Sequence, residues 1–261
     1  MNSSEADDVV DHNKFLLFRN LLRNYVVRNL IYTHCKYILS IEKLFDDGII
    51  CEYPLIGDYT FESMSIKAEI VKSIKQQYLW ATTKSIHRRA IPPLLNGVDI
   101  HVKYSTYSNV SVSTYAISLL NMIDLKLEGC CQALVIAPTR EVSNYVHDVF
   151  NRIGEGMKDV KIKKINGGTN ARSDVFEIRK KNVHIIICTP GRVSFYIESG
   201  DIDLSTVKYV ILESIDDILN MGFSYTMDMI FKALPLEAVR VSMYSHIERD
   251  SESTYNHSST K

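Results

Sequence analysis

Three short segments of the sequence place small and basic residues directly after apolar runs. They are Pro138-Thr139-Arg140, Gly167-Gly168-Thr169 and Thr189-Pro190-Gly191-Arg192. Each follows a segment expected to be a buried strand and opens one expected to be a helix, so its backbone N–H groups are orphan donors. These donors and the helix dipole favour phosphate, and Arg140 and Arg192 would add charge-assisted hydrogen bonds. One such turn is ordinary, but three in this order are a specific signal of a phosphate-binding surface.

A fourth segment carries acidic side chains. The apolar run 207–212 is followed by Glu213, Asp216 and Asp217. In α/β proteins the carboxyl end of a buried parallel strand is where ligands bind, and carboxylates there commonly hold Mg²⁺. Alternatively, Ser214 or Asp216 caps the helix that runs on to residue 221. The segment by itself favours neither interpretation.

Composition limits the classes of partner. The chain has 261 residues, of which 46% are hydrophobic and 23% charged, so it can bury the core of one large domain with appendages. Its net charge of −1 excludes a strong overall field for nucleic acid, so such binding must rely on local groups. Five scattered cysteines indicate reduced thiols of a cytoplasmic or nuclear protein. The sequence shows neither a membrane span nor a secretory signal.

The elements that position these segments alternate regularly from Thr60 onward. Such alternation predicts an α/β fold with a single doubly wound parallel sheet and helices on both faces. The expected strands are 98–102, 133–137, 160–165, 184–188, 207–212 and 239–243. The expected helices are 66–77, 85–95, 114–123, 141–153, 173–180, 193–199 and 227–234.

Two appendages flank this domain, which we place at 60–247. Residues 1–59 predict an N-terminal helical extension, because apolar residues recur at near-helical spacing between Lys14 and Leu44. One face of it is basic and either contacts RNA or a membrane surface or is simply solvated; we favour the solvated face. Residues 248–261 are rich in Ser, Thr and Glu, which predicts a disordered tail.

Between Thr60 and Ile247 the chain resembles the N-terminal RecA-like domain of DEAD-box RNA helicases, and among them the helicases of translation initiation and the exon junction. The stretches that carry the resemblance are 61–64, 89–91, 115–120, 132–142, 167–170, 189–193 and 216–223. In that family the three turns grip the sugar–phosphate backbone of single-stranded RNA without reading its bases. The resemblance therefore implies RNA-binding roles for Pro138, Thr139, Arg140, Gly167, Gly168, Thr169, Thr189, Pro190, Gly191 and Arg192.

The segments that the resemblance assigns to ATP depart from the family pattern. A P-loop needs glycine N–H groups and a lysine around the phosphates, yet no glycine lies between Gly97 and Gly129. The glutamine that reads adenine in the family falls at His87, while Phe61, which would stack near adenine, is retained. The degenerate nucleotide-binding set that the resemblance implies is Phe61, His87, Ser105, Ser108 and Ser111.

The acidic motif of the family is also altered, and reads Glu213-Ser214-Ile215-Asp216. The metal-holding aspartate is replaced by a longer glutamate, and Ser214 cannot act as the family's base. The motif that couples hydrolysis to unwinding falls at Tyr244-Ser245-His246. Because the sequence ends at Lys261, we also expect no second RecA-like domain to supply arginines to a transferring phosphoryl group.

In place of bound nucleotide, we expect Tyr107, Val110 and Val112 to fill the space of the phosphates and Thr114 to cap the following helix.

We therefore expect a catalytically degenerate DEAD-box-like protein that binds single-stranded RNA weakly and without sequence preference, helicase scaffold proteins, or both. No cofactor is expected, with ATP and Mg²⁺ required only if the family activity survives. Two alternatives stay open. One is a working ATP-dependent RNA helicase of translation initiation or mRNA processing, and the other is an interaction module without RNA affinity.

Overall fold

The computed structural model describes residues 60–78, 82–104, 109–127, 129–168, 170–180 and 183–245. The predicted N-terminal extension, its basic face and the predicted C-terminal tail lie outside these residues. So do Ser105, Tyr107, Ser108 and Thr169, together with His246.

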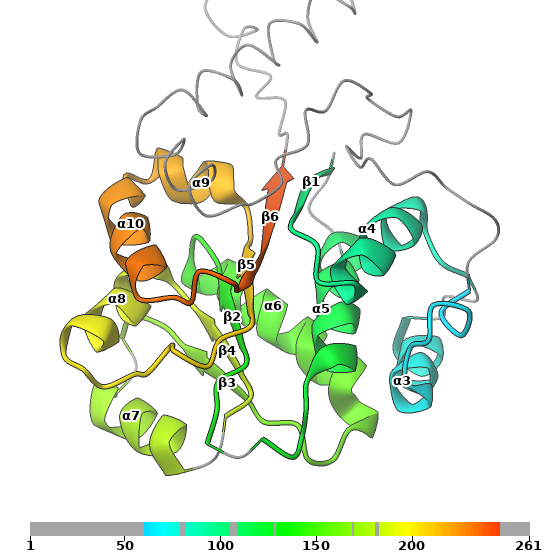
Figure 1. Ribbon diagram of the computed structural model, residues 1–261, viewed down its shortest axis with the longest axis horizontal. Coiled ribbons are helices and arrows are strands. Elements are labelled where there is room, and N and C mark those ends of the chain that lie inside the picture. The colour runs from blue at the N-terminus through cyan, green and yellow to red at the C-terminus, as the bar shows by residue number, and fades with distance from the viewer. Residues whose placement is uncertain are drawn as a thin grey trace, which may run out of the picture.

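Six strands form one sheet in the order β1-β6-β5-β2-β4-β3, and every pairing is parallel (Figure 1). The predicted single parallel sheet is thereby confirmed. The strands are β1 (Ile100–Tyr104), β2 (Ala133–Ile136), β3 (Ile162–Ile165), β4 (Ile185–Cys188), β5 (Tyr209–Leu212) and β6 (Val239–Ser245).

Helices cover both faces of this sheet, as the alternating pattern predicted (Figure 1). They are α3 (Ala68–Tyr78), α4 (Ser85–Leu95), α5 (Asn109–Met122), α6 (Arg140–Ile153), α7 (Ala171–Lys180), α8 (Pro190–Glu198), α9 (Ile215–Asn220) and α10 (Ser224–Lys232). A 3₁₀ turn, Gly154–Gly156, follows α6 directly.

The apolar runs of the central strands serve two cores at once. In β2, Ala133 and Val135 belong to the core beneath α3, α4, α5 and α6, whereas Leu134 and Ile136 belong to the core beneath α8, α9 and α10. Because successive side chains of a strand point to opposite faces, a strand buried on both faces must be apolar throughout. This is why these strands read as continuous apolar runs.

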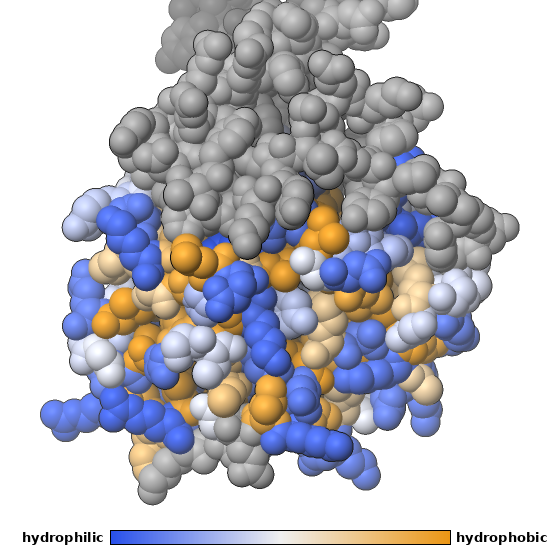
Figure 2. All heavy atoms as spheres, viewed as in Figure 1, coloured by the Kyte–Doolittle hydropathy of each residue, from blue (hydrophilic) through white to orange (hydrophobic). Residues whose placement is uncertain are grey.

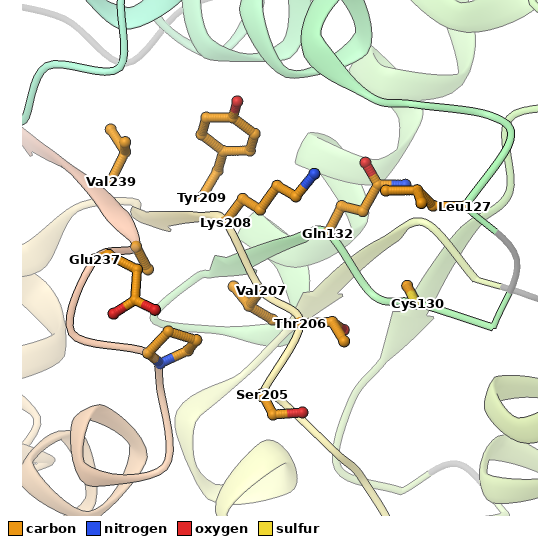
Figure 3. Close-up of a pocket in the computed structure, with 12 residues that line it drawn as sticks. Leu127, Cys130, Gln132, Ser205, Thr206, Val207, Lys208, Tyr209, Glu237 and Val239 are labelled. Atoms are coloured by element: carbon orange, nitrogen blue, oxygen red, sulfur yellow. The ribbon is translucent and has the colours of Figure 1, made fainter.

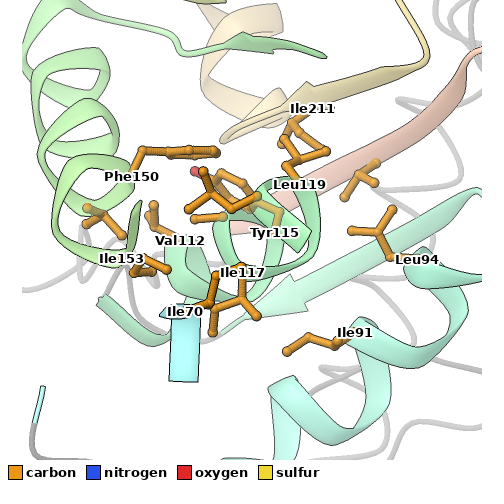
Figure 4. Packing of buried hydrophobic residues seen from close by; sticks show 14 of the residues in the cluster. Ile70, Ile91, Leu94, Val112, Tyr115, Ile117, Leu119, Phe150, Ile153 and Ile211 are labelled. Carbon is orange, nitrogen blue, oxygen red and sulfur yellow. The ribbon is translucent and has the colours of Figure 1, made fainter. Parts of the chain in front are cut away.

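The first core is built around α5, which is enclosed by neighbouring helices (Figure 4). Tyr115, Ala116, Ile117, Leu119 and Leu120 are all fully buried. The Tyr115 and Phe150 rings pack with centroids 6.0 Å apart and join α5 to α6. A helix in such an interior position must satisfy its polar side chains internally, as Ser118 does by donating to the carbonyl of Thr114 at 2.9 Å.

One boundary prediction was wrong in a way that matters for the site. Helix α5 begins at Asn109 instead of residue 114, so Thr114 is not a cap. The hydroxyls of Ser113 and Thr114 instead donate to the carbonyl of Val110, at 2.9 and 2.8 Å. This bonding back to the preceding turn satisfies hydroxyls inside the helix, and it lets the helix extend into the segment we had expected to be a loop.

The other shifts are smaller. Strand β1 begins at Ile100 instead of residue 98, because Val98 still belongs to the end of α4. The Val98 N–H donates to the carbonyl of Pro93, and the Gly97 N–H donates to the carbonyl of Leu94. These two bonds form a Schellman motif, which needs the positive φ of +72° that Gly97 adopts. Helix α10 begins at Ser224, ahead of the expected 227.

The central position of β2 makes a prediction for stability. Leu134 is fully buried, so Leu134→Ala should lower the free energy of unfolding by about 2–5 kcal/mol. Leu236, which is 72% exposed, provides the matched control, and Leu236→Ala should change it by less than about 0.5 kcal/mol. Urea unfolding of both variants measures the difference, and equal losses would contradict the burial of β2.

Candidate functional site

Three turns were predicted to bind phosphate: 138–140, the turn at Gly167 and Gly168, and 189–192. These phosphate turns and the acidic segment meet at one edge of the sheet, formed by the carboxyl ends of its strands. They follow β2, β3, β4 and β5, which are neighbours in the order β5-β2-β4-β3. Ile136 pairs with both Cys188 and Leu212, and Cys188 also pairs with Ile165. The carboxyl ends of the four strands are therefore level, and the turns that follow them lie side by side (Figure 1).

The first turn presents an exposed cation. Thr139 is the N-cap of α6, and its hydroxyl oxygen accepts a hydrogen bond from the Val142 N–H at 3.2 Å. Pro138 before it is buried, whereas Arg140 after it is exposed. The hydroxyl of Thr139 is thus occupied in fixing the helix start, and Arg140 is the group that faces solvent.

The second turn lies directly against that arginine. A Cβ atom at Gly167 would stand 3.0 Å from Nη2 of Arg140, and one at Gly168 would stand 3.1 Å from Nη1. Gly168 also has φ of +92°, a conformation that other residues rarely adopt. The backbone of Gly168 therefore favours glycine, and the absence of a side chain at both positions leaves room for the guanidinium, a reason that the sequence did not reveal. Asn170 then caps α7, because its Oδ1 accepts from the N–H groups of Arg172 and Ser173 at 3.0 and 3.4 Å.

The third turn opens α8. Thr189 is its N-cap residue but makes no side-chain cap hydrogen bond, and Pro190 occupies the first helical turn, where its missing N–H is harmless. Gly191 is exposed. The guanidinium of Arg192 is held inward, with Nη2 3.4 Å from Oδ2 of Asp174, and its side chain is only 14% exposed.

The residues that hold Arg192 were missed by sequence reasoning. Asp174 lies in the first turn of α7 and also accepts a 3.0 Å hydrogen bond from the hydroxyl of Tyr196. Burial, and next the hydrogen bond to Asp174, raise the pKa of Tyr196 to about 12. In the sequence Asp174 has the position of an ordinary helix-start acid and Tyr196 lies in an apolar stripe, so neither pattern indicated a partnership.

The acids of the acidic segment differ in burial, since Glu213 is buried whereas Asp216 and Asp217 are half-buried. The side chain of Glu213 is fully buried, its N–H extends the β5–β2 ladder to Ile136 O at 2.9 Å, and its Oε1 accepts from Ser214 Oγ at 3.2 Å. Ser214 occupies the N-cap position of α9 in a left-handed conformation, φ 48°, yet makes no cap hydrogen bond. Such a backbone is strained for serine. Among the described residues, no group of three or more His, Cys, Asp and Glu side chains has metal-binding geometry.

The residues that the resemblance assigns to adenine are packed on each other. The rings of Phe61 and His87 lie 5.3 Å apart, and the two side chains are 2% and 0% exposed. Nδ1 of His87 accepts the Lys84 N–H at 3.2 Å, and Nε2 lies 3.0 Å from Ser113 Oγ, which donates to Val110 O. These bonds require the neutral imidazole with its proton on Nε2, and burial lowers the pKa of His87 to about 3.

The serines of the predicted nucleotide set do not form a described loop. Ser111 lies within α5 and is 1% exposed. Ser105 and Ser108 lie outside the described residues.

A cavity of about 460 Å³ lies at the opposite edge of the sheet, beside the amino ends of β2, β5 and β6 (Figure 3). Gln132 on its wall is already bonded through both amide atoms to the backbone of Asp124, at 3.0 and 2.7 Å. The cavity is therefore remote from the phosphate turns, and the amide of Gln132 is already hydrogen-bonded within the protein.

The fold and the turns can now be compared with known proteins. The family model for DEAD/DEAH box helicases matches residues 84–245. The chain belongs to this family. Over 206 residues it is 31% identical to the ATP-dependent RNA helicase eIF4A of Aspergillus niger, covering 79% of this chain and 50% of that protein. Over 179 residues it is 35% identical to the ATP-dependent RNA helicase FAL1 of Meyerozyma guilliermondii, covering 69% and 44%.

Among solved structures, a DEAD box protein of Methanococcus jannaschii superposes with a TM-score of 0.66 at 26% identity, over 74% of this chain and 52% of that one. The predicted RecA-like fold is therefore confirmed. The DEAD/DEAH box chain spans about half the length of the curated relatives it matches. Within its described residues, no helix is long and apolar enough to cross a membrane.

The burial of neutral His87 predicts a dependence of stability on pH. The folded-state pKa lies near 3 and the ordinary value is 6.5, so the unfolded chain binds more protons between these values and stability falls as pH falls. Between about pH 7 and pH 5, His87 should cost about 2 kcal/mol of unfolding free energy. Urea unfolding of wild type and His87→Gln isolates this term, since the other histidines are common to both; equal losses would contradict it.

Proposed function

We propose that this DEAD/DEAH box chain binds the backbone of single-stranded RNA without reading its sequence and does not hydrolyse ATP. The observation that carries the proposal is the exposed Arg140 seated over Gly167 and Gly168, on the same sheet edge as the exposed Gly191 at the start of α8. A cation beside backbone that carries no side chain suits the phosphates of a single strand.

Local groups must supply this affinity, because the chain as a whole has a net charge of −1. Figure 2 shows hydrophilic and hydrophobic residues interspersed on the part of this face that is not grey. Binding of this kind is expected to be weak and to fall steeply with salt, since each phosphate contact releases counterions.

The residues on the nucleotide side do not fit ATP. Adenine recognition needs a side chain with a free donor or acceptor, and His87 already uses both ring nitrogens on Lys84 and Ser113. Phosphate recognition needs glycine amides, and the stretch before α5 has none. Glu213 is fully buried at the position where the family holds its metal. Binding of Mg-ATP would require these groups to rearrange.

The second candidate function is a working helicase, and the names of the relatives favour it, since the proteins of Aspergillus niger and Meyerozyma guilliermondii are both called ATP-dependent RNA helicases. A role in translation initiation or mRNA processing, a cytoplasmic or nuclear location and contacts with helicase scaffold proteins are proposals of the same origin. An ATPase assay separates the two candidates.

Arg140→Ala should weaken binding of a labelled oligouridine by about tenfold or more, because it removes a charge-assisted contact of about 1.5–3 kcal/mol. The dependence of log affinity on log salt should become shallower by about 0.7, the contribution of one phosphate on a single strand. Fluorescence anisotropy across a salt series measures both. Arg152→Ala is the matched control, because Arg152 is exposed at the other end of α6.

The basic residues of the predicted N-terminal extension, 1–59, are the competing source of affinity. In the full chain, the combined Arg19→Gln, Arg23→Gln and Arg28→Gln substitutions should leave the effect of Arg140→Ala in place. If they abolish binding while Arg140→Ala has no effect, the sheet edge does not bind RNA and the interaction-module alternative is favoured.

Mg-ATP should neither bind at micromolar concentration nor be hydrolysed above background. Calorimetric titration and phosphate release measure these directly, and thermal unfolding provides a third readout, since a ligand specific for the native state must raise its melting temperature. A melting temperature that rises with Mg-ATP, or hydrolysis that is lost in Asp216→Asn, would support the working helicase instead.

A further inference from the structure

A buried carboxylate joins the second and third phosphate turns. Asp174 is 3% exposed and receives three partners. Lys163 Nζ lies 3.2 Å from its Oδ1, while the Tyr196 hydroxyl at 3.0 Å and Arg192 Nη2 at 3.4 Å share its Oδ2. Lys163 also pairs with Glu177 at 3.2 Å, so the cluster includes strand β3, helix α7 and helix α8.

The guanidinium of Arg192 is held from a second side as well. It lies 5.0 Å from the ring centre of Tyr196 and 5.9 Å from that of Phe195, both on its own helix. Cations are attracted to aromatic faces at such distances. With its side chain 14% exposed, Arg192 is committed to the interior, in contrast to the exposed Arg140.

The place of the cluster in the chain suggests what it does. Asp174 is in the first turn of α7, directly after the turn at Gly167 and Gly168, and its backbone N–H bonds Asn170 O at 3.0 Å. Arg192 is in the first turn of α8, and its N–H bonds Thr189 O at 3.1 Å. A bond between the two side chains therefore connects the starts of α7 and α8, the helices that follow the second and third phosphate turns.

We infer that Arg192 is a positioning residue that does not contact phosphate, and that Asp174, with Tyr196, holds the second and third phosphate turns at a fixed spacing. The inference rests on the proposed RNA-binding function and refines it, because it leaves Arg140 as the cation of this edge that meets RNA. If Arg192 turned to RNA, the buried carboxylate of Asp174 would lose one of its two cationic partners and keep only Lys163, so the turn costs an established ion pair.

Salt dependence distinguishes a positioning residue from a phosphate ligand. Arg192→Gln and Tyr196→Phe should each weaken oligouridine binding by about tenfold or less while the slope of log affinity against log salt stays at the wild-type value. Arg140→Gln should lower that slope by about 0.7. A slope lowered equally in Arg192→Gln would overturn the inference.

A double-mutant cycle of Asp174 and Arg192 provides a second test. If the pair acts as one unit, adding Arg192→Gln to Asp174→Asn should weaken binding no further, because the partner is already lost. Additive losses would show that Arg192 has a partner of its own on the RNA. We call the contacts of Asp174 with Arg192 and Tyr196 the clamp. Tyr196→Phe removes only a hydroxyl of the clamp, whereas Val193→Ala removes buried apolar atoms from the same helix and leaves the clamp intact. Comparing the two variants separates loss of the clamp from general loss of stability.

Hydrogen exchange of the free protein tests the clamp without RNA. Amides of the segments 167–170 and 189–192 should exchange faster in Asp174→Asn and Tyr196→Phe than in Val193→Ala. Equal rates in all three would overturn the clamp. A wild-type chain that binds no RNA would refute the proposed function, and the exchange rates would still decide whether Asp174 holds the two turns.

Discussion

Parallel pairing of β5, β2, β4 and β3 in level register is the constraint on which the rest of the molecule depends. It brings the turns after four strands to one edge, although they are spread from residue 137 to residue 216. The register holds because each strand serves two cores at once, and a shift by one residue would exchange the side chains of Val135 and Leu134 between them. Burial of the strand side chains in the two cores therefore fixes the relative positions of the turns at this edge.

The two sides of that edge are built differently. On the proposed RNA side, Arg140 and Gly191 are exposed, and the polar groups behind them are bonded to each other through Asp174 and Asn170. On the nucleotide side, Phe61, His87 and Ser113 turn inward and satisfy one another. A buried polar group without partners is costly. The ring nitrogens of His87 bond the Lys84 N–H and Ser113, and the Ser113 hydroxyl donates to the carbonyl of Val110, so these buried groups have partners within the protein.

Much of this was predictable from the sequence, because strands buried on both faces and turns that open helices leave strong local patterns. The sheet, its helices and the positions of the three turns followed from them. The start of α5 was missed, because a run rich in serine and threonine is typical of a polar loop. In the structure the hydroxyls of Ser113 and Thr114 donate to a carbonyl one turn back, so this run is helical. The seat of Arg140 over Gly167 and the inward turn of Arg192 were missed too, because both depend on contacts between segments that only the tertiary fold brings together.

The central claim is that the proposed RNA-binding edge is accessible to its ligand whereas the residues around His87 cannot bind nucleotide. Mapping of backbone amide chemical shifts tests both parts in one protein sample. Single-stranded RNA should shift the amides of Gly168 and Gly191 and leave those near His87 unchanged, while Mg-ATP should shift none of them. Shifts at Phe61 and His87 on addition of Mg-ATP, with none at Gly168 on addition of RNA, would contradict the account at its centre.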